Sequence, residues 1–505
     1  MRHLLSNSQA LQLDAESRQL GLPSLSLMEQ AGLLMYQALL ELWHPSPQNM
    51  AVFLVGTGNN GGDGLVIARQ ALLENKFRVR CLLWGEASTS ECQLQLHLVQ
   101  TLGGECLSWD DPRAEAWLSG ADLWVDALLG VGWKAPIRDT ARERLARLEE
   151  FRKKYNPLVA AVDVPSGLNE DSKLFPAKLF PDGPVLTATW TLAAGFGKNS
   201  CFHPQQRRYT GQLVSVPVAF PAPLPPETVF WLDEGDLSTL GGTVPDDVWK
   251  NTRGHVAVAA GSLDYPGAGL LACRSAQSAG AGLVTLVNNH ELAVPPSVMS
   301  RSEERFAELK CSAIVAGPGW GRDQQREVFL QKLWQAPWPM VVDADGLVAL
   351  ASLLRQKRLP ARPKTIITPH PGELARLLEA LNVSQGTPMS FLEAMELLAK
   401  TVGGVVVAKD SVTWIVSAEG KKAVWDGREP GLATGGTGDC LAGFMGAYLA
   451  RGRSMWDAAC SGVILQGTAG KALANSKGWF TADDLWEEAA RFASCASRAN
   501  SFRLK

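Results

Sequence analysis

Short apolar runs alternate with helical patterns along the first half of the chain, and this alternation predicts an α/β domain. Four runs have the character of buried strands: Ala51–Val55, Val79–Trp84, Leu123–Leu128 and Leu158–Val164. Between them, residues 65–73 and 141–151 carry apolar positions at helical spacing. Strands that alternate with helices form a parallel sheet covered on both faces.

The second half repeats this pattern with different motifs. Its strand-like runs are HVAVAA, GLVTLV, AIVAG, MVVDAD, TIITPH and VVVAKD, and residues 373–380 form an amphipathic stretch. Between the halves, residues 220–228 contain four prolines, which make a stiff, extended connector. We therefore predict domains at residues 1–222 and 228–503, each large enough for its own hydrophobic core.

The composition indicates a soluble globular protein. The 505 residues include 48 Lys and Arg against 51 Asp and Glu, and 46% are hydrophobic. This balance argues against a disordered chain and against binding nucleic acid or a membrane by charge alone. No apolar run reaches the ~18–20 residues of a spanning helix, and residues 1–20 lack a signal-peptide core. The nine cysteines show no zinc spacing, so we expect reduced thiols in a cytoplasmic protein.

A glycine-rich motif, GTGNNGGDG at residues 56–64, follows the first strand. It is neither a dinucleotide fingerprint nor a Walker A loop, although amides at a strand–helix junction suit phosphate. A tight turn capped by the motif's own Asn and Asp would give the same pattern. Asp126 in LWVDALLG, and Asp163 with Ser166 in VDVPSG, also stand at strand ends, where open α/β sheets bind ligands. Convergence of these oxygens would suit a hard cation rather than zinc.

These motifs resemble the NAD(P)H-hydrate epimerase family. Residues 5–32, ending in LPSLSLMEQAG, precede GNNGGDG, VDALLG and VDVPSG, and the likeness covers roughly residues 1–220. It implies a Rossmann-like three-layer α/β/α domain that interconverts the R and S epimers of hydrated NADH and NADPH. Epimerisation requires reversible opening of the bond between the hydrated carbon and oxygen, and a carboxylate such as Asp163 would move the proton.

The same resemblance implies the residues of this site. A potassium ion would be held by Asn60, Asp126 and Ser166, and Asp163 would be catalytic. The hydrate would contact Asn59, Asn60, Gly61, Gly62, Asp63, Gly130, Val131, Gly132, Trp133, Lys134, Ala135, Pro136 and Asp163.

The second half carries its own glycine-rich motif, TGGTGDCLAG at residues 434–443. A helix that begins here offers backbone amides to an anion, and Asp439 falls in its first turn. An Asp beside an anion pocket is a candidate base toward a hydroxyl that becomes phosphorylated, although it could also only stabilise the helix start. The motifs AGPG, VDADG and TPHPGE follow other strand-like runs, and His370 between two prolines is typical of a site residue.

This half resembles the ribokinase-like superfamily and, within it, the ADP- or ATP-dependent NAD(P)H-hydrate dehydratases. The likeness rests on RGH, GSLDYPGAGLLA, AGPG, VDADGL, TPHPGE, VVVAKD and GGTGDCLAG, across about residues 228–500. It implies a ribokinase-like α/β domain that removes water from the S-hydrate and cleaves ADP to AMP and phosphate, with Mg²⁺ beside the nucleotide. The hydroxyl would be phosphorylated first, with Asp439 as the base, and phosphate would then be eliminated.

The dehydratase resemblance also implies contacts. The hydrate would touch Ala268, Gly319, His370 and Asp439, and the nucleotide would touch Lys409, Asp410, Ser411, Val412, Thr413 and Gly438. Asp410 and Thr434 differ from the family pattern. A carboxylate at position 410 would repel a phosphate unless it points away or binds Mg²⁺.

Two other functions fit parts of the sequence. One is a ribokinase-like small-molecule kinase with an N-terminal binding scaffold, and the other is a scaffold without catalysis. The fused first half and the HPGE loop argue against the kinase, and the acidic residues Asp63, Asp126 and Asp163 argue against the scaffold. The order of the halves favours a bifunctional metabolite-repair enzyme, and the family resemblance suggests a homo-oligomer.

Overall fold

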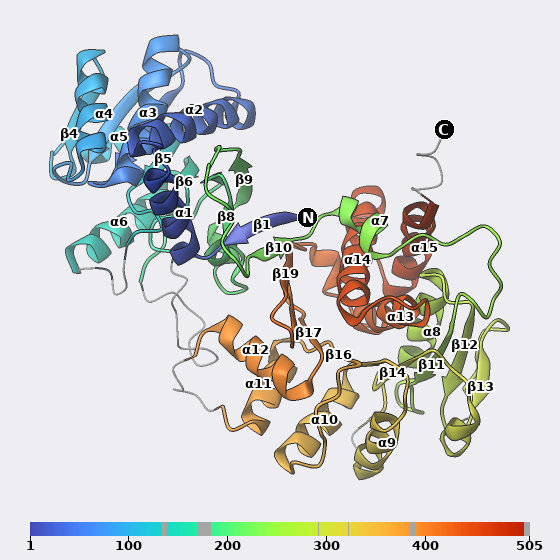
Figure 1. Cartoon of the computed structure of the whole chain (residues 1–505). Coiled ribbons are helices and arrows are strands. Elements are labelled where there is room, and N and C mark those ends of the chain that lie inside the picture. Colours follow the sequence, from blue (N-terminus) through green and yellow to red (C-terminus); the bar gives the residue numbers. More distant parts are fainter. Residues whose placement is uncertain are drawn as a thin grey trace. The chain divides into compact units, whose positions relative to one another are not determined.

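Figure 1 shows the computed structural model of the chain, which describes residues 1–133, 137, 139–168, 183–290, 292–321, 323–383 and 389–498. The described residues form two compact units. One lies within residues 3–229, and the other runs from residue 230 onward and includes Met1 and Arg2. Within the described ranges, no helix is both long enough and apolar enough to cross a lipid bilayer.

The first unit is built on a parallel sheet with the strand order β4-β3-β2-β5-β6-β7-β9. Its strands are β2 (Met50–Val55), β3 (Arg78–Leu83), β4 (Glu105–Ser108), β5 (Leu123–Ala127), β6 (Leu158–Val162), β7 (Trp190–Ala194) and β9 (Gln212–Val216). The order reverses between β2 and β5, and ligands bind outside the carboxyl ends of strands at such a point. Strand β1 (Arg2–Leu5) pairs in parallel with the short β8 (Gly197–Lys198).

Helices cover both faces of this sheet. They are α1 (Asn7–Gln19), α2 (Ser24–Trp43), α3 (Asn59–Glu74), α4 (Ser90–Thr101), α5 (Ala114–Ser119) and α6 (Asp139–Tyr155), with 3₁₀ turns η1 (Asn199–Phe202) and η2 (Arg207–Tyr209). Phe53 packs in one hydrophobic cluster with α2 and α3, whereas its neighbours Val52 and Leu54 pack in another with α5 and α6. Successive side chains of a strand point to opposite faces, so a continuous apolar run fits a strand buried on both sides.

The second unit contains a longer sheet, with the order β13-β12-β11-β14-β15-β16-β17-β18-β19-β10. Its strands are β10 (Val229–Trp231), β11 (His255–Ala259), β12 (Leu283–Val287), β13 (Met299–Arg301), β14 (Ala313–Ala316), β15 (Met340–Val342), β16 (Thr365–Ile367), β17 (Val405–Ala408), β18 (Thr413–Ser417) and β19 (Lys422–Trp425). From β13 to β17 the strands are parallel, and β18 is antiparallel to both of its neighbours. The predicted α/β class is confirmed for both halves.

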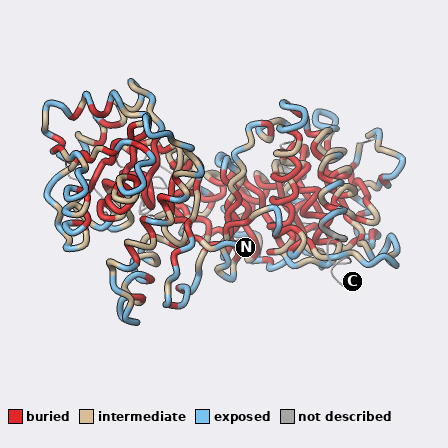
Figure 2. Tube along the Cα trace, turned by 90° about the horizontal axis from the view of Figure 1, so that it is seen from above, coloured by how far each residue is buried: buried red, intermediate tan, exposed pale blue. Residues whose placement is uncertain are grey.

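The central strands of the second unit are buried, and helices pack against them. Buried segments are red in Figure 2. The helices are α7 (Leu237–Leu240), α8 (Pro266–Ser278), α9 (Gln324–Trp334), α10 (Asp345–Arg355), α11 (Pro371–Ala380), α12 (Phe391–Val402), α13 (Thr437–Ala450), α14 (Met455–Lys477) and α15 (Ala482–Arg498), with 3₁₀ turns η3 (Glu234–Asp236), η4 (Glu303–Glu308) and η5 (Pro430–Leu432). Residues 440–450 of α13 are all buried, as expected for a helix that is apolar on every side. A Cβ on Gly443 would lie 2.3 Å from the carbonyl oxygen of Ala272, so glycine permits the close packing of α13 on α8.

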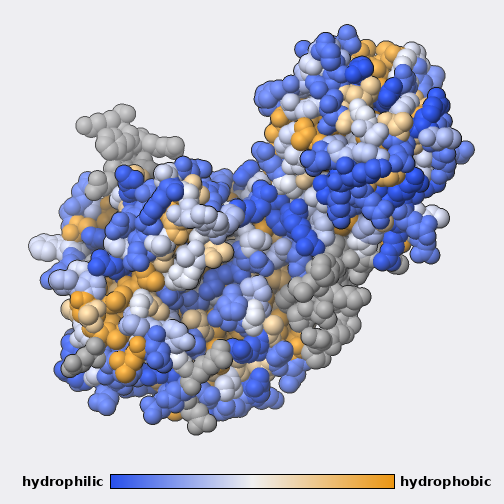
Figure 3. All heavy atoms as spheres, turned by 180° about the vertical axis from the view of Figure 1, so that it is seen from behind, coloured by the Kyte–Doolittle hydropathy of each residue, from blue (hydrophilic) through white to orange (hydrophobic). Residues whose placement is uncertain are grey.

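The surface is mainly hydrophilic on the face in Figure 3, where hydrophobic residues form separate patches. The nine cysteines are free thiols. All except Cys106 and Cys495 are buried, and a buried cysteine behaves as a small hydrophobic residue.

Candidate active sites

A cavity of about 540 Å³ lies at the carboxyl ends of β2, β5 and β6 in the first unit. Its wall includes residues of the first glycine-rich motif, the loop after β5, Asp163, and residues of α1 and α2. The predicted site residues on this wall are Asn59, Asn60, Asp63, Gly130, Val131, Gly132, Trp133 and Asp163. Lys134, Ala135 and Pro136 lie outside the described residues.

The first glycine-rich motif is not the loop that the sequence suggested. Helix α3 already begins at Asn59, so the second half of the motif is helical. Gly61 and Gly62 are buried and do not line the cavity. A Cβ on Gly61 would lie 2.1 Å from the carbonyl oxygen of Gly56, and one on Gly62 would lie 2.4 Å from Cε of Met28. These glycines therefore permit close packing of the helix start.

Asp163 forms a buried ion pair with Lys198 of β8. Lys198 Nζ also donates to the carbonyl oxygens of Ala194 at 3.2 Å and Phe196 at 2.9 Å, so each ammonium proton has an acceptor. Asp163 has a φ of 66°, a left-handed conformation that is uncommon outside glycine and often occurs at functional sites. The sequence analysis missed Lys198, although a lysine within the apolar segment AAGFGKNSCF is an unusual feature.

Two further carboxyl groups line the same cavity. Burial, followed by the negative charges of Asp163 and Asp14, raises the pKa of Asp63 well above its usual range, and Lys198 opposes the rise. Asp14 of α1 is open to the water of the cavity, and partial desolvation followed by the charge of Asp163 raises its pKa. Neither carboxyl group has a hydrogen-bond partner among the described residues. Sequence reasoning did not identify Asp14.

Asp126 and Ser166 are fully buried next to this cavity. The hydroxyl of Ser166 donates to Oδ1 of Asp126 at 2.6 Å, and the amides of Ser166 and Leu128 donate to the same carboxylate at 2.8 and 3.3 Å. Burial raises the pKa of Asp126 to about 6, although these hydrogen bonds oppose the rise. Asn60 of α3 lies next to Gly130 in the loop after β5, because a Cβ on Gly130 would lie 2.8 Å from Oδ1 of Asn60.

The second site lies at the carboxyl ends of β15, β16 and β17 and at the start of α13. Lys409, directly after β17, lies 2.7 Å from Oδ1 of Asp343, which follows β15. Thr368 donates its hydroxyl to the same oxygen at 2.8 Å. A Cβ on Gly438 would lie 3.4 Å from Nζ of Lys409 and 3.6 Å from Oδ2 of Asp343. The predicted residues Lys409 and Gly438 are therefore neighbours, and Asp343 joins them although the sequence analysis did not select it.

Asp439 stands in the first turn of α13. Burial, followed by the negative charge of Asp343, raises its pKa to about 7, and Asp345 contributes to the rise while Lys409 opposes it. At neutral pH both protonation states of such a group are populated, which is what a general base requires.

His370 caps the N-terminus of α11, with Nδ1 accepting from the amide of Gly372 at 3.1 Å. Glu373 accepts from the amide of His370 at 2.9 Å, and its Oε1 lies 3.4 Å from Nε2 of the imidazole. Burial raises the pKa of Glu373 to about 7. Burial, followed by the charge of Lys409, lowers the pKa of His370, so the imidazole is neutral at pH 7.

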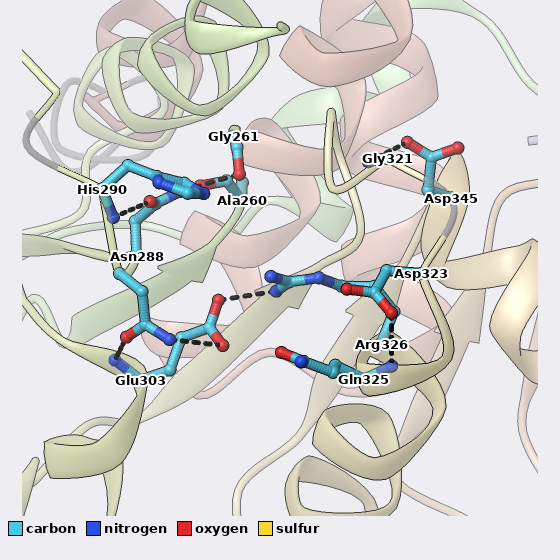
Figure 4. A network of polar contacts seen from close by, with 11 residues as sticks. Ala260, Gly261, Asn288, His290, Glu303, Gly321, Asp323, Gln325, Arg326 and Asp345 are labelled. Atoms are coloured by element: carbon cyan, nitrogen blue, oxygen red, sulfur yellow. Dashed lines mark hydrogen bonds and ion pairs between the residues drawn. The ribbon is translucent and has the colours of Figure 1, made fainter. Parts of the chain in front are cut away.

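Gly319, in the loop after β14, and Ala268, in the first turn of α8, lie against each other. Gly319 has a φ of 62°, and a Cβ there would lie 2.8 Å from Cβ of Ala268. A polar network supports this region (Figure 4): Oδ2 of Asp345 accepts from the amide of Gly321 at 2.8 Å, and Arg326 donates to Glu303 at 2.6 Å. Asp345 therefore fixes the Gly319 loop while its charge acts on the second site.

Residues 410–413, which the sequence predicted to contact the nucleotide, differ in how far they are exposed. Asp410 is exposed, and its Oδ1 accepts from the amide of Ser411 at 2.6 Å. The side chain of Val412 is fully buried and Thr413 begins β18, so Val412 can offer only its backbone to a ligand. The carboxylate of Asp410 is thus engaged with its own loop.

Two α/β units, each with carboxyl groups and a lysine at the ends of strands, define a protein with two separate candidate active sites. Comparisons with known proteins agree with this division. The family model of the YjeF-related protein N-terminus matches residues 24–200, and that of NAD(P)H-hydrate dehydratase matches residues 256–491. The chain belongs to the family of bifunctional NAD(P)H-hydrate repair enzymes.

The similarity to curated members extends over nearly the whole chain. The bifunctional NAD(P)H-hydrate repair enzyme Nnr of Pyrobaculum aerophilum is 30% identical, with 95% of each chain covered. The enzyme of the same name from Escherichia coli is also 30% identical, over 90% of this chain and 86% of that one. Among solved structures, a ribokinase-like superfamily protein from Enterococcus faecalis aligns with a TM-score of 0.48 and 24% identity, covering 54% of this chain and 97% of that chain.

Proposed function

We propose that residues 1–222 interconvert the R and S hydrates of NADH and NADPH, and that residues 228–503 dehydrate the S-hydrate with ADP. The family supports this proposal, since its curated relatives are named as bifunctional NAD(P)H-hydrate repair enzymes. The observation that carries it is the presence of a separate carboxyl–lysine cluster in each unit: Asp163 paired with Lys198, and Asp439 near the ion pair of Lys409 and Asp343. An epimerase joined to an S-specific dehydratase makes both epimers repairable by one chain.

In the first site, the hydrated ring carbon exchanges its hydroxyl group between two faces. The lone pair of the ring nitrogen expels the oxygen as water once an acid supplies a proton, and water then adds to either face of the iminium. Asp163 takes the proton from the returning water. Its ion pair with Lys198 holds the carboxylate in place at the cavity wall.

Asn60, Asp126 and Ser166 would hold the potassium ion. These side chains are hard oxygen donors and suit such a cation. The amide nitrogen of Asn60 is buried without a hydrogen-bond partner among the described residues, so no donated bond opposes turning its oxygen toward a cation. A bound cation would supply positive charge and stabilise the buried Asp126 carboxylate. The donor set therefore fits potassium.

In the second site, Asp439 takes the proton of the substrate hydroxyl as its oxygen attacks the terminal phosphoryl group of ADP. AMP leaves, and the phosphate ester is then eliminated together with a proton of the neighbouring ring carbon, which restores the dihydropyridine. Backbone amides at residues 436–439, at the start of α13, would face the developing phosphoryl charge, and Lys409 would add a point charge.

Mg²⁺ would enter with the nucleotide phosphates. Among the described residues, no cluster of three or more His, Cys, Asp or Glu side chains could hold a metal ion. Mg²⁺ commonly takes one or two carboxylates in addition to phosphates and water. Oδ2 of Asp343, on the side of Gly438, is a donor of this kind, so the site fits Mg²⁺ that arrives with ADP. The ion would neutralise part of the phosphate charge.

Recovery of the absorbance of reduced nicotinamide from a mixed R and S hydrate pool tests the proposal, with ADP, Mg²⁺ and K⁺ present. Full recovery is expected. Recovery that stops when the S form is consumed would contradict the epimerase assignment. Recovery with ATP but not ADP would correct the nucleotide, and no recovery with either would favour a small-molecule kinase.

A further inference from the structure

The cavity of the first unit contains more acid–base groups than the proposed epimerase mechanism has used so far. Asp14 comes from α1, Asp63 from the start of α3 and Asp163 from the end of β6, and all three line the same cavity. Lys198 donates its protons to Asp163 and to two carbonyl oxygens, so it forms no hydrogen bond with the other two carboxyl groups.

Exchange of a hydroxyl group between two faces of a ring needs two proton transfers. The departing oxygen must receive a proton, and the returning water must lose one on the opposite face. A single carboxyl group on one face cannot reach both oxygens. A pair of carboxyl groups from different structural elements can serve both.

We propose that Asp14 is the second catalytic acid–base residue of the first site and acts as the partner of Asp163. This inference rests on the epimerase function proposed above. Asp14 gives its proton to the hydroxyl oxygen, the carbon–oxygen bond breaks with its electron pair on oxygen, and water leaves as the ring iminium forms. Water then bonds to the opposite face of the carbon and gives a proton to Asp163. No oxidation or reduction occurs, and in the reverse direction the two residues exchange roles.

Asp14 suits this role better than Asp63 does. The side chain of Asp14 is open to the water of the cavity, so its proton can be replaced between turnovers, whereas Asp63 is half-buried on α3. The charged groups that act on Asp14 are Arg18 on its own helix and Asp163 and Lys198 across the cavity; Asp63 on α3 is coupled to it as well. The raised pKa of Asp14 favours the protonated form that donates to the leaving hydroxyl.

An Asp14→Asn variant of the full chain tests this inference, with Glu16→Gln as a matched control. Glu16 is on the same helix, is outside the cavity wall, and accepts a hydrogen bond from Gln12 at 2.7 Å. The exchange of R and S hydrates is followed by chromatography without ADP, so that dehydration does not occur. We expect Asp14→Asn to slow exchange by about 100-fold or more, Asp14→Glu to restore part of the rate, and Glu16→Gln to have no effect.

Three further readouts separate catalysis from a structural role. Dehydration of the S-hydrate with ADP should match the parent in every variant, and the thermal unfolding midpoint should not fall below that of the parent in any of them. The parent exchange rate should fall as the pH rises through the pKa of Asp14, and the residual rate of Asp14→Asn should lack this decline. Exchange at the parent rate in Asp14→Asn, or a slow rate with the parental pH profile, would overturn the inference. No exchange in the parent itself would instead contradict the proposed function.

Discussion

Replacement of Asp439 by Asn should strongly slow dehydration and at the same time stabilise the second unit at alkaline pH. The two effects have one cause. Burial and the charge of Asp343 make ionisation of Asp439 unfavourable, which destabilises the fold. The ionised form is nevertheless the one that takes the substrate proton. Asn keeps the shape of the side chain but cannot accept that proton, so we expect a loss of about 100-fold to 10,000-fold in dehydration.

The size of the stability effect follows from the pKa of Asp439, which rises from 3.8 in the unfolded chain to about 7 in the folded protein. This difference corresponds to about 4 kcal/mol at 1.36 kcal/mol per pH unit. Solvent reaches part of the side chain, so we expect about 2 kcal/mol. Well below pH 3.8 the group is protonated in both states and has no effect on stability. As the pH rises from 4 to 7, the buried Asp439 progressively lowers the free energy of unfolding of the parent by this amount, about 2 kcal/mol. Above pH 7 the full decrease remains.

The assay is urea unfolding of the parent and of Asp439→Asn at several pH values, followed by tryptophan fluorescence. Glu419→Gln, on the exposed turn between β18 and β19, is the matched control. The advantage of Asp439→Asn should be absent near pH 4 and complete near pH 8, whereas the control should show no such trend. An advantage independent of pH, or a less stable Asp439→Asn at pH 8, would refute the reasoning.

Three other outcomes are expected from the structure. Lys409→Met leaves the buried carboxylate of Asp343 without its partner. The free energy of unfolding in urea should therefore fall by about 3 kcal/mol, and the KM for ADP should rise. An unchanged unfolding midpoint would contradict the ion pair. Exchange of K⁺ for tetramethylammonium should slow the interconversion of R and S hydrates and leave dehydration of the S-hydrate unchanged, and equal effects on both activities would contradict the assigned cation site. Gly61→Ala should destabilise the first unit by about 1–3 kcal/mol, because the new Cβ would meet the carbonyl oxygen of Gly56, whereas Gly58→Ala has free space and should be nearly neutral; similar unfolding midpoints would contradict the packing of α3.

The mainly parallel sheets were predictable because their strands are apolar on both faces. Continuous runs such as 51–55 and 123–128 have to be buried on both sides, and the structure buries them between two layers of helices. The beginning of α3 was not predictable in the same way. Glycine is unfavourable inside a helix, so the sequence pattern predicted a loop up to Gly64. In the structure α3 begins at Asn59, because tertiary contacts override this preference. Positions 61 and 62 pack against Gly56 and Met28 and have room only for glycine.

The same distinction between local and tertiary information explains which site residues sequence reasoning could find. Some site residues stand at the boundary of an element that the sequence pattern predicts. Asp126, Asp163 and Lys409 stand at or just after the end of a strand, and Asp439 stands in the first turn of a helix. Asp14 and Lys198 carry no such mark, because Asp14 is one of many polar positions of α1 and Lys198 ends a two-residue strand. They reach Asp163 only after α1 and β8 have packed around the cavity. The motifs therefore locate the carboxyl groups at strand ends and helix starts, whereas the groups that surround Asp163 in the first cavity depend on chain topology.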